Sequence, residues 1–239
     1  MAEHKQIAIV AALEREVGPL VRGWRVVQVG EASLKCFERL SAVVVCGGVG
    51  EEAARRAAEI VVRAYHPELL VSTGFAGALD DSLKVGQAFR PGRVVDARDN
   101  SRTEIAFGTG TLVSFPTIAG AEQKANLATS YGAQAVDMEA AAVAKAAERH
   151  GINFAVVKAI SDERDFEPPP LEGFVTRSGQ FRDRAFAWFA LLRPWLWPGV
   201  FRLARNSSRA SKELSLELGR FIADVEQRTL KQLQPAQRV

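Results

Sequence analysis

Three carboxylates stand beside apolar stretches of the sequence, where side chains of this type can carry acid–base chemistry. Glu16 follows the first apolar run, Glu139 lies in an alanine-rich stretch, and Asp162 ends the last apolar run. A carboxyl group can transfer a proton, and a carboxylate with fixed acceptor oxygens suits two neighbouring hydroxyls. Each residue also has a structural interpretation: a helix N-cap for Asp162, a solvated charge cluster for Glu16, and an exposed helix for Glu139.

The residues next to each carboxylate help to decide between its structural and its chemical interpretation. Val136, Met138 and the alanines at 140–142 flank Glu139 with apolar side chains, which argues against an exposed helix. Glu16 is favoured over Glu14 because it stands directly before Val17. For Asp162, taken alone, the N-cap and the chemical interpretation weigh equally.

Four short motifs decide between them. They occur in the order Ala12–Val17 (ALEREV), Ser72–Gly77 (STGFAG), Val136–Ala140 (VDMEA) and Lys158–Asp162 (KAISD). In this order and spacing they resemble the purine nucleoside phosphorylase superfamily, above all the methylthioadenosine and adenosylhomocysteine nucleosidases. Each motif is weak alone, whereas four in order are a specific signal. The resemblance covers roughly the first 165 residues.

The resemblance implies cleavage of a purine–sugar bond and assigns the two catalytic residues. Asp162, oriented by Ser161, corresponds to the acid that donates a proton toward purine N7. Glu16 corresponds to the carboxylate that activates the attacking water. Each acid or base contribution is typically worth about 10²–10⁴ in rate.

The resemblance also implies the contacts to the sugar. Glu139 is expected to accept hydrogen bonds from the 2′ and 3′ hydroxyls, with Met138 against the ribose and Asp137 in place of a more usual glutamate. The turn Gly47–Gly50, including Gly48, is expected to pack against the sugar pocket. A phosphate cradle is disfavoured there, because GxGxxG is absent and Glu51 and Glu52 would repel phosphate.

The turn Gly74–Gly77 bears on the nucleophile and on the base. Phosphorylases of the superfamily hold phosphate with arginines and a hydroxyl in this turn, but Phe75 stands where a small or hydroxyl residue is common. Phe75, Ala76 and Gly77 are expected to line the nucleoside site, with Phe75 or Phe115 stacking on the base. Water is favoured as co-substrate. Phosphate is the alternative, and the residues that could hold it are Arg15, Arg55 and Arg90.

The segment Phe181–Arg209 departs from the family pattern, since it mixes aromatic residues with arginines and holds three of the four tryptophans. A core helix hairpin broken at Pro194 and Pro198, a membrane-interfacial patch and the wall of an apolar pocket are all compatible with it. The segment resembles the hopanoid-associated branch of the superfamily. That resemblance implies release of adenine from adenosylhopane, a lipid-linked nucleoside.

Apolar runs that alternate with helical patterns predict an α/β fold, a single-domain nucleoside phosphorylase-like fold with a mixed central sheet flanked by helices. We expect residues 1–165 to form the catalytic core and 166–239 to form a C-terminal extension of the same domain. The expected strands are Ile7–Leu13, Ser41–Cys46, Leu69–Thr73, Ala88–Val95, Ile105–Phe107, Thr111–Ser114 and Phe154–Ile160; the expected helices are Glu51–Tyr65, Ala135–Arg149 and Ser211–Leu233.

The amino-acid composition limits which classes of protein and which partners are compatible with the sequence. Hydrophobic residues make up 47% and charged residues 25%, which argues against disorder. The net charge of +3 predicts no nucleic-acid partner. Three scattered histidines and two cysteines predict no metal, and no cofactor is implied. A polar N-terminus predicts a cytoplasmic protein, peripheral at the inner membrane face if the aromatic segment contacts lipid. The resemblance implies a homo-oligomer; a non-catalytic nucleoside- or lipid-binding protein of the same fold is the competing hypothesis.

Overall fold

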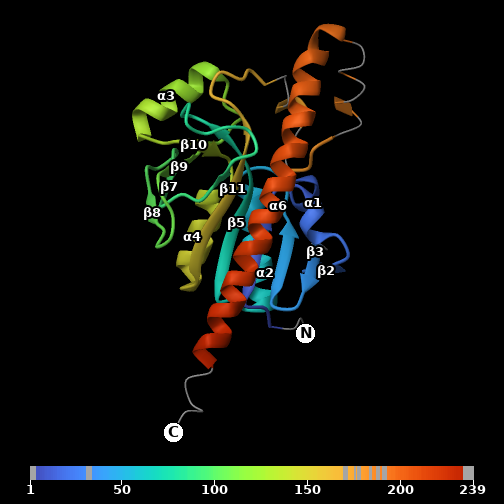
Figure 1. Cartoon of the computed structure of the whole chain (residues 1–239), viewed down its shortest axis with the longest axis vertical. Helices are drawn as coiled ribbons and strands as arrows, with labels where there is room; N and C mark the ends of the chain where they lie inside the picture. Colours follow the sequence, from blue (N-terminus) through green and yellow to red (C-terminus); the bar gives the residue numbers. More distant parts are fainter. Residues whose placement is uncertain are drawn as a thin grey trace.

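The computed structural model describes residues 4–30, 34–168, 172–174, 176, 179–182, 185, 186, 189 and 193–233. Within these residues, eleven strands form one mixed sheet, as predicted, and helices flank it (Figure 1). The strands are β1 (Ile7–Ala11), β2 (Arg25–Val29), β3 (Leu34–Arg39), β4 (Ala42–Cys46), β5 (Leu69–Ala78), β6 (Ala88–Phe89), β7 (Arg93–Asp96), β8 (Arg102–Glu104), β9 (Thr111–Ser114), β10 (Ala135–Asp137) and β11 (Asn153–Asp162).

The centre of the sheet is parallel and fully apolar. β1 pairs in parallel with β4 on one side and β5 on the other, and β5 pairs in parallel with β11. All five residues of β1 are buried, which is typical of a strand with helices on both faces. The path through the sheet is β2-β3-β4-β1-β5-β10-β9-β7-β8; β11 branches from β5, and β6 pairs with β11.

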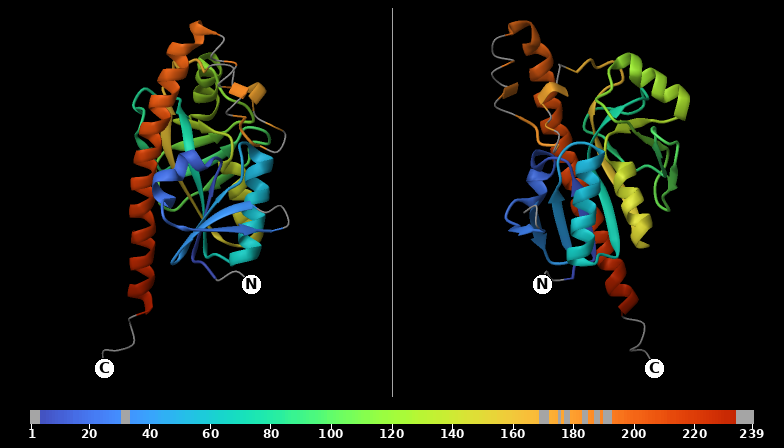
Figure 2. Two further views of the ribbon diagram at one scale, coloured as in Figure 1. Left: turned by 90° about the vertical axis from the view of Figure 1, so that its right-hand side faces the viewer. Right: turned by 180° about the vertical axis from the view of Figure 1, so that it is seen from behind.

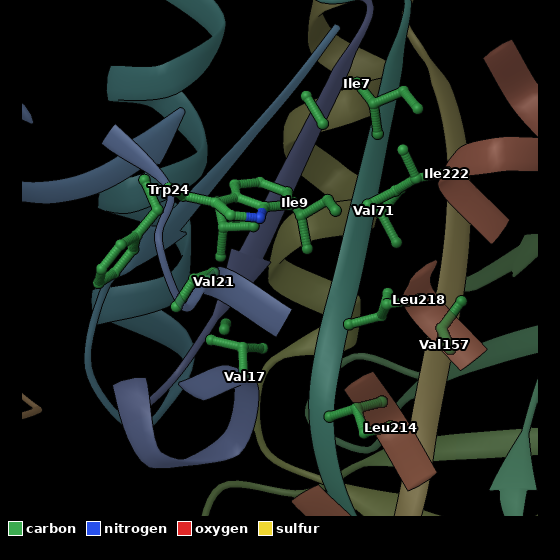
Figure 3. Close-up of a cluster of buried hydrophobic side chains, with 14 of the residues drawn as sticks. Ile7, Ile9, Val17, Val21, Trp24, Val71, Val157, Leu214, Leu218 and Ile222 are labelled. Carbon is green, nitrogen blue, oxygen red and sulfur yellow. The ribbon is translucent and has the colours of Figure 1, made fainter. Parts of the chain in front are cut away.

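Helices cover both faces of this sheet (Figure 2). α2 and α4 pack on one face through alanines and valines, and α1 and α6 pack on the other. Figure 3 shows Leu214, Leu218 and Ile222 of α6 pointing toward Val71 of β5 and Val157 of β11. The helices are α1 (Glu14–Val21), α2 (Glu51–Tyr65), α3 (Ala121–Tyr131), α4 (Ala140–His150) and α6 (Trp197–Leu233), with short 3₁₀ turns at Glu172–Phe174 and Pro194–Leu196.

The helix predicted over Ala135–Arg149 is wrong in its first residues. Ala135–Asp137 form β10, which pairs with β9 on one edge and with the end of β5 on the other. Glu139 is the N-cap residue of α4, which begins at Ala140. Pairing on both edges outweighs the helical propensity of the alanine-rich stretch.

Two other strand predictions need correction. The run Ala88–Val95 is divided into β6 and β7 by Pro91-Gly92, because proline cannot donate to a strand ladder. The strand predicted at Ile105–Phe107 lies instead at Arg102–Glu104, where it pairs with β7. The structure also contains β2, β3 and α3, for which the sequence analysis predicts no element.

The C-terminal helix is much longer than predicted. α6 has 37 residues and begins at Trp197, so the described part of Phe181–Arg209 is not a helix hairpin broken at Pro198. Pro198 lies in the first helical turn, where its missing N–H costs nothing. Arg184, Trp188 and Leu192, which belong to the aromatic segment Phe181–Arg209, lie outside the described residues. No helix in the described ranges is both long and apolar enough to cross a bilayer.

Candidate active site

The carboxyl ends of the central strands surround a cavity of about 820 Å³. In open α/β sheets, ligands bind at this end of the strands. The residues following β1, the bend of β5, the residues after β10 and the end of β11 all contribute to its wall, and the first half of α6 closes one side. Its reactive part contains Glu16, Phe75, Ala76, Gly77, Lys124, Asp137, Met138, Glu139, Ser161 and Asp162.

Two glycines of β5 let carboxylates approach the strand backbone. Gly74 has a positive φ of 132°, and a Cβ there would lie 2.9 Å from Oε2 of Glu16. A Cβ on Gly77 would lie 2.9 Å from Oδ2 of Asp162 and 3.1 Å from Cε of Lys124. The two residues that were predicted to be catalytic therefore lie directly against the glycines of the STGFAG motif, where a larger residue would displace them.

Glu16 lies in the first turn of α1 and is buried. Its Oε2 accepts hydrogen bonds from the backbone N–H groups of Ala12 and Leu13, each 3.2 Å long. Burial raises the pKa of Glu16 above its ordinary value, although the Leu13 N–H and the Lys158 charge oppose this effect. A carboxylate with a raised pKa is a better proton acceptor at neutral pH.

Glu139 is held by the glycine-rich turn after β4. The backbone N–H of Gly50 donates to Oε1 of Glu139 at 2.8 Å. Burial, together with the neighbouring Asp137 carboxylate, raises the pKa of Glu139 to about 7. The turn therefore contacts the candidate sugar-binding carboxylate directly.

Asp137 and Lys158 form an ion pair beneath the cavity. Their atoms Oδ2 and Nζ are 2.7 Å apart, and both side chains are fully buried. Asp137 also accepts hydrogen bonds from Ser114 Oγ at 2.6 Å and from the Ala140 N–H at 2.9 Å. Burial alone would lower the pKa of Lys158, but attraction to Asp137 and Glu139 outweighs burial and raises it. The Asp137 carboxylate, predicted to bind substrate, is thus sealed within the protein.

Asp162 is aimed by a bulge at the end of β11. The register against β5 shifts between Ile160 and Asp162, which leaves Ser161 as the extra residue. Ser161 Oγ donates to Oδ1 of Asp162 at 2.6 Å, and the ammonium of Lys124 pairs with Oδ2. Lys124, on α3, also donates to the Glu163 carbonyl at 2.7 Å. Asp162 keeps 19% of its side-chain surface exposed, while Lys124 keeps 1%.

The structure brings together most, but not all, of the predicted site residues. Gly48 is not on the cavity wall, although its neighbour Val49 is. Phe115 borders a separate small hollow beside Arg98 and Met138 and is not on the wall of the main cavity. Phe75 remains the candidate for stacking on a base. The other predicted residues share one cavity: Glu16, Phe75, Ala76, Gly77, Met138, Glu139, Ser161 and Asp162. Asp137 reaches the cavity wall through its backbone only, because its side chain is fully buried.

The three arginines considered for phosphate lie in different places. Arg15 is on the cavity wall, with its guanidinium 4.9 Å from the ring centre of Phe181. Arg55 pairs with Glu52 on the surface of α2, and Arg90 pairs with Glu217 of α6. Neither Arg55 nor Arg90 lines the cavity. Among the described residues, histidine, cysteine and acidic side chains form no group of three or more that could hold a metal ion.

Two parts of the site escaped the sequence analysis. Lys124 sits in α3, an element with no strong apolar period, so nothing in the sequence distinguished it from a surface lysine. The apolar wall from α6 was considered only as one interpretation of the aromatic segment. That wall includes Val200, Leu203 and Ala204 of α6, and Phe166 and Phe186 from the chain before α6 adjoin it.

Comparison with protein families identifies the group to which this arrangement belongs. Residues 6–117 and 95–189 match the model described as the Phosphorylase superfamily. The chain belongs to this superfamily. The 5′-methylthioadenosine/S-adenosylhomocysteine nucleosidase of Staphylococcus saprophyticus is 29% identical over 157 residues, which is 52% of this chain and 69% of that protein. The enzyme of the same name from Staphylococcus aureus strain MRSA252 is 25% identical over 200 residues, covering 65% and 86%.

Solved structures show the same fold at lower sequence identity. The apo form of Arabidopsis thaliana 5′-methylthioadenosine nucleosidase aligns with a TM-score of 0.71 at 16% identity, covering 94% of this chain and 96% of that one. S-adenosylhomocysteine nucleosidase from Streptococcus pyogenes, in complex with 5-methylthiotubericidin, aligns with a TM-score of 0.68 at 19% identity, covering 94% and 98%. The predicted nucleoside phosphorylase-like fold is therefore confirmed.

Proposed function

We propose that this chain hydrolyses the N-glycosidic bond of a 5′-substituted adenosine and releases adenine. One observation carries the proposal: Glu16, Glu139 and Asp162 come from separate elements and line one cavity. Similarity to proteins named methylthioadenosine/adenosylhomocysteine nucleosidases supports adenine as the base and a substituent at the 5′ position.

The chemistry needs a proton for the leaving base and a nucleophile for the sugar. Asp162 is paired with the Lys124 ammonium, so it first takes up a proton from solvent and then donates it toward N7 of the purine as the bond to C1′ breaks. Lys124 and Ser161 then stabilise the carboxylate that remains, because both already donate to its two oxygens. Glu16 removes a proton from the water that attacks C1′, and Glu139 accepts hydrogen bonds from the ribose hydroxyls.

Water is the proposed nucleophile rather than phosphate. Of the three arginines considered for phosphate, Arg15 alone reaches the cavity, and its guanidinium stacks on Phe181. Phosphate also carries two negative charges near neutral pH, and Glu16 and Glu139 would repel it. Phosphorolysis at Arg15 is the alternative that the assay below separates.

The 5′ substituent is proposed to be large and apolar, as in adenosylhopane. This finer proposal rests on the wall of α6, where Val200, Leu203 and Ala204 face the cavity together with Phe166. A volume of about 820 Å³ lies near the upper end for pockets that hold a small ligand. The reactive residues occupy one part of it, which leaves an apolar part for the substituent.

The test is an assay of purified protein with methylthioadenosine, adenosylhomocysteine and a long-chain 5′-alkyl adenosine, each with and without phosphate. Mass spectrometry follows adenine and the sugar product. Adenine with free sugar in the absence of phosphate is the expected result, and the alkyl substrate should react fastest. A strict need for phosphate, with a sugar 1-phosphate as product, would identify a phosphorylase.

The competing hypothesis is a binding protein that retains the fold. It predicts saturable binding of adenosine derivatives with no adenine released from any of them. Under that hypothesis Asp162→Asn would leave affinity unchanged, because a binder needs no acid for a leaving group.

A further inference from the structure

The first half of α6 differs in charge from the second half. Residues 193–212 contain five basic side chains and no acidic one, whereas residues 213–233 contain four acidic side chains and three basic ones. The cationic end is the orange, upper end of α6 in Figure 1, and it extends beyond the sheet. The C-terminal half instead packs Leu214, Leu218 and Ile222 onto the core.

Large aromatic side chains are exposed at the same end. Trp195, directly before α6, keeps 73% of its surface exposed, and Phe201 keeps 69%. Removing such rings from water is strongly favourable, so two of them exposed within one stretch of seven residues indicate an interaction surface. Trp197 adds a third partly exposed ring between them.

Arginines gather beside these rings. Arg202, Arg205 and Arg209 follow each other at spacings of three and four, so they share one face of α6. Together with Asn206, Val85 and Glu163 they border a hollow of about 420 Å³. Arg202 is held in place by stacking 4.4 Å from the ring centre of Phe166. Three guanidinium groups against one carboxylate give this hollow a net positive charge.

We propose that the N-terminal end of α6 docks on an anionic lipid surface. Tryptophan and phenylalanine insert at the boundary between headgroups and acyl chains, and arginines beside them bind lipid phosphates. Trp195 and Phe201 supply the inserted rings, and the hollow of Arg202, Arg205 and Arg209 receives the headgroup.

Two other occupants fit this surface less well. A two-fold contact with a second copy places the same patch on both partners, so the arginine stripe would face itself and repel. A nucleic acid needs basic residues that follow many phosphates along a groove, whereas these arginines surround a single hollow. The combination of exposed rings and a compact cationic hollow favours lipid.

Docking has a consequence for the cavity. Val200, Leu203 and Ala204 belong to the same turns of α6 and line the candidate active site. A docked helix would hold that site at the membrane surface, where an apolar nucleoside would be located. This consequence rests on the proposed function, whereas docking itself does not depend on any chemistry.

The test is flotation of the full chain with two kinds of vesicle, phosphatidylcholine alone and phosphatidylcholine mixed with phosphatidylserine. We expect binding to the mixed vesicles and much weaker binding to the neutral ones. The variant Arg202→Gln/Arg205→Gln/Arg209→Gln should lower the partition coefficient about a hundredfold, since each basic residue near an anionic surface contributes about fivefold. Trp195→Ala/Phe201→Ala should lower it about tenfold or more on both kinds of vesicle.

Matched variants on the rest of the surface are the controls. Arg25→Gln/Arg63→Gln/Arg220→Gln removes three other exposed arginines, and Leu40→Ala/Leu216→Ala removes two other exposed apolar side chains. Both should bind vesicles like the wild type. Thermal unfolding of every variant checks the fold, and the single change Trp195→Ala replaces the double one if that variant melts early.

Four results would overturn the proposal. The wild type could fail to float with either vesicle, or the control variants could lose binding as much as the α6 variants do. Light scattering could show a dimer that Trp195→Ala/Phe201→Ala converts to monomer, which would assign the surface to a second copy of the chain. Tight binding of an RNA oligonucleotide that vesicles do not displace would assign it to nucleic acid.

Discussion

Two lysine–aspartate pairs lie within the same end of the sheet, and they differ in how far they reach solvent. Lys158 and Asp137 are both fully buried, and their neighbours are Ser114 and the first turn of α4. Lys124 is equally buried, but its partner Asp162 is 19% exposed and borders the cavity. The first pair is closed to ligands, whereas the second presents one carboxylate to them.

The difference indicates what each pair does. A sealed pair cannot exchange protons with a substrate, so Asp137 and Lys158 act through the residues that they position, chiefly Glu139 and the start of α4. An open pair can contact the substrate through Asp162, while Lys124 holds it from behind. Loss of the sealed pair should therefore affect stability first, and loss of the open pair should affect turnover first.

The largest effect is expected for Asp162→Asn. The amide has nearly the same shape, but it has no proton to donate to N7, so kcat should fall about 10²–10⁴-fold while KM changes little. Release of adenine under saturating substrate measures this. Glu163→Gln, which removes the next carboxylate along the chain, is the control and should keep wild-type turnover. Equal losses for both variants would contradict the role of Asp162.

Lys158→Met should have the largest effect on stability. It leaves the Asp137 carboxylate buried without its counter-charge, which should lower the free energy of unfolding by about 3–5 kcal/mol. Urea unfolding followed by circular dichroism measures the change.

Two further variants test whether the stability lost in Lys158→Met comes from the buried, unpaired charge of Asp137. Lys145→Met removes a lysine that is one-third exposed and pairs with Asp96 and Asp99, so its cost should be much smaller. Lys158→Met/Asp137→Asn should recover part of the loss, because no buried charge remains alone. A double variant less stable than the single one would break the comparison between the two pairs.

Of the open pair, only Asp162 stands in a sequence motif. Both members of the sealed pair stand in motifs, but the contact between them was not predicted. Asp162 and Lys158 both belong to KAISD, and Asp137 belongs to VDMEA. The order and spacing of these motifs therefore predicted that the three residues lie near one site. That the Asp137 side chain turns inward did not follow, since its partner lies 21 residues away on another strand. Lys124 has no motif, and its contact with Asp162 depends on how α3 packs after β9.

The fold was predictable where apolar runs were long. β1, β4 and α2 lie where the sequence placed them, because a buried parallel strand and a helix with one apolar face leave clear patterns. β10 was hidden in alanines that favour a helix, and the exposed strand β2 alternates too weakly to stand out. The missed part of α6, residues 197–210, has Pro198 and Gly199 near its start, which disfavour a helix locally, and Ala210 is its one residue in the core cluster beneath α6.

Glu139 offers a test of how the sealed pair influences the site, because Asp137 adds to the burial that raises the Glu139 pKa to about 7. Ionised Glu139 is the form that accepts ribose hydroxyls, so KM should rise as pH falls through about 7. The folded pKa lies above the unfolded value of 4.5. This contribution to stability is therefore fully present below pH 4.5 and is lost as pH rises through about 7.

The measurement is urea unfolding of the wild type and Glu139→Gln across this pH range. The difference between the two free energies should change by on the order of 3 kcal/mol, with the wild type losing stability relative to the variant as pH rises. Asp137→Asn should reduce the change, since it removes the neighbouring negative charge. Parallel pH curves for the wild type and Glu139→Gln would show that Glu139 titrates as it does in solvent.

Lys124→Met should have the smallest effect, and it separates a positioning role from a structural one. Asp162 keeps Ser161 and its access to water, so stability should fall by only about 1 kcal/mol. Without the ammonium, the carboxylate left after proton transfer is less stabilised, and kcat should fall about tenfold with KM nearly unchanged. In the Asp162→Asn background the same change should cost no further turnover, because Lys124 acts through the lost carboxylate. An undiminished tenfold loss in that background would mean that Lys124 acts on the site independently of Asp162, and the two lysine–aspartate pairs would then differ in exposure but not in role.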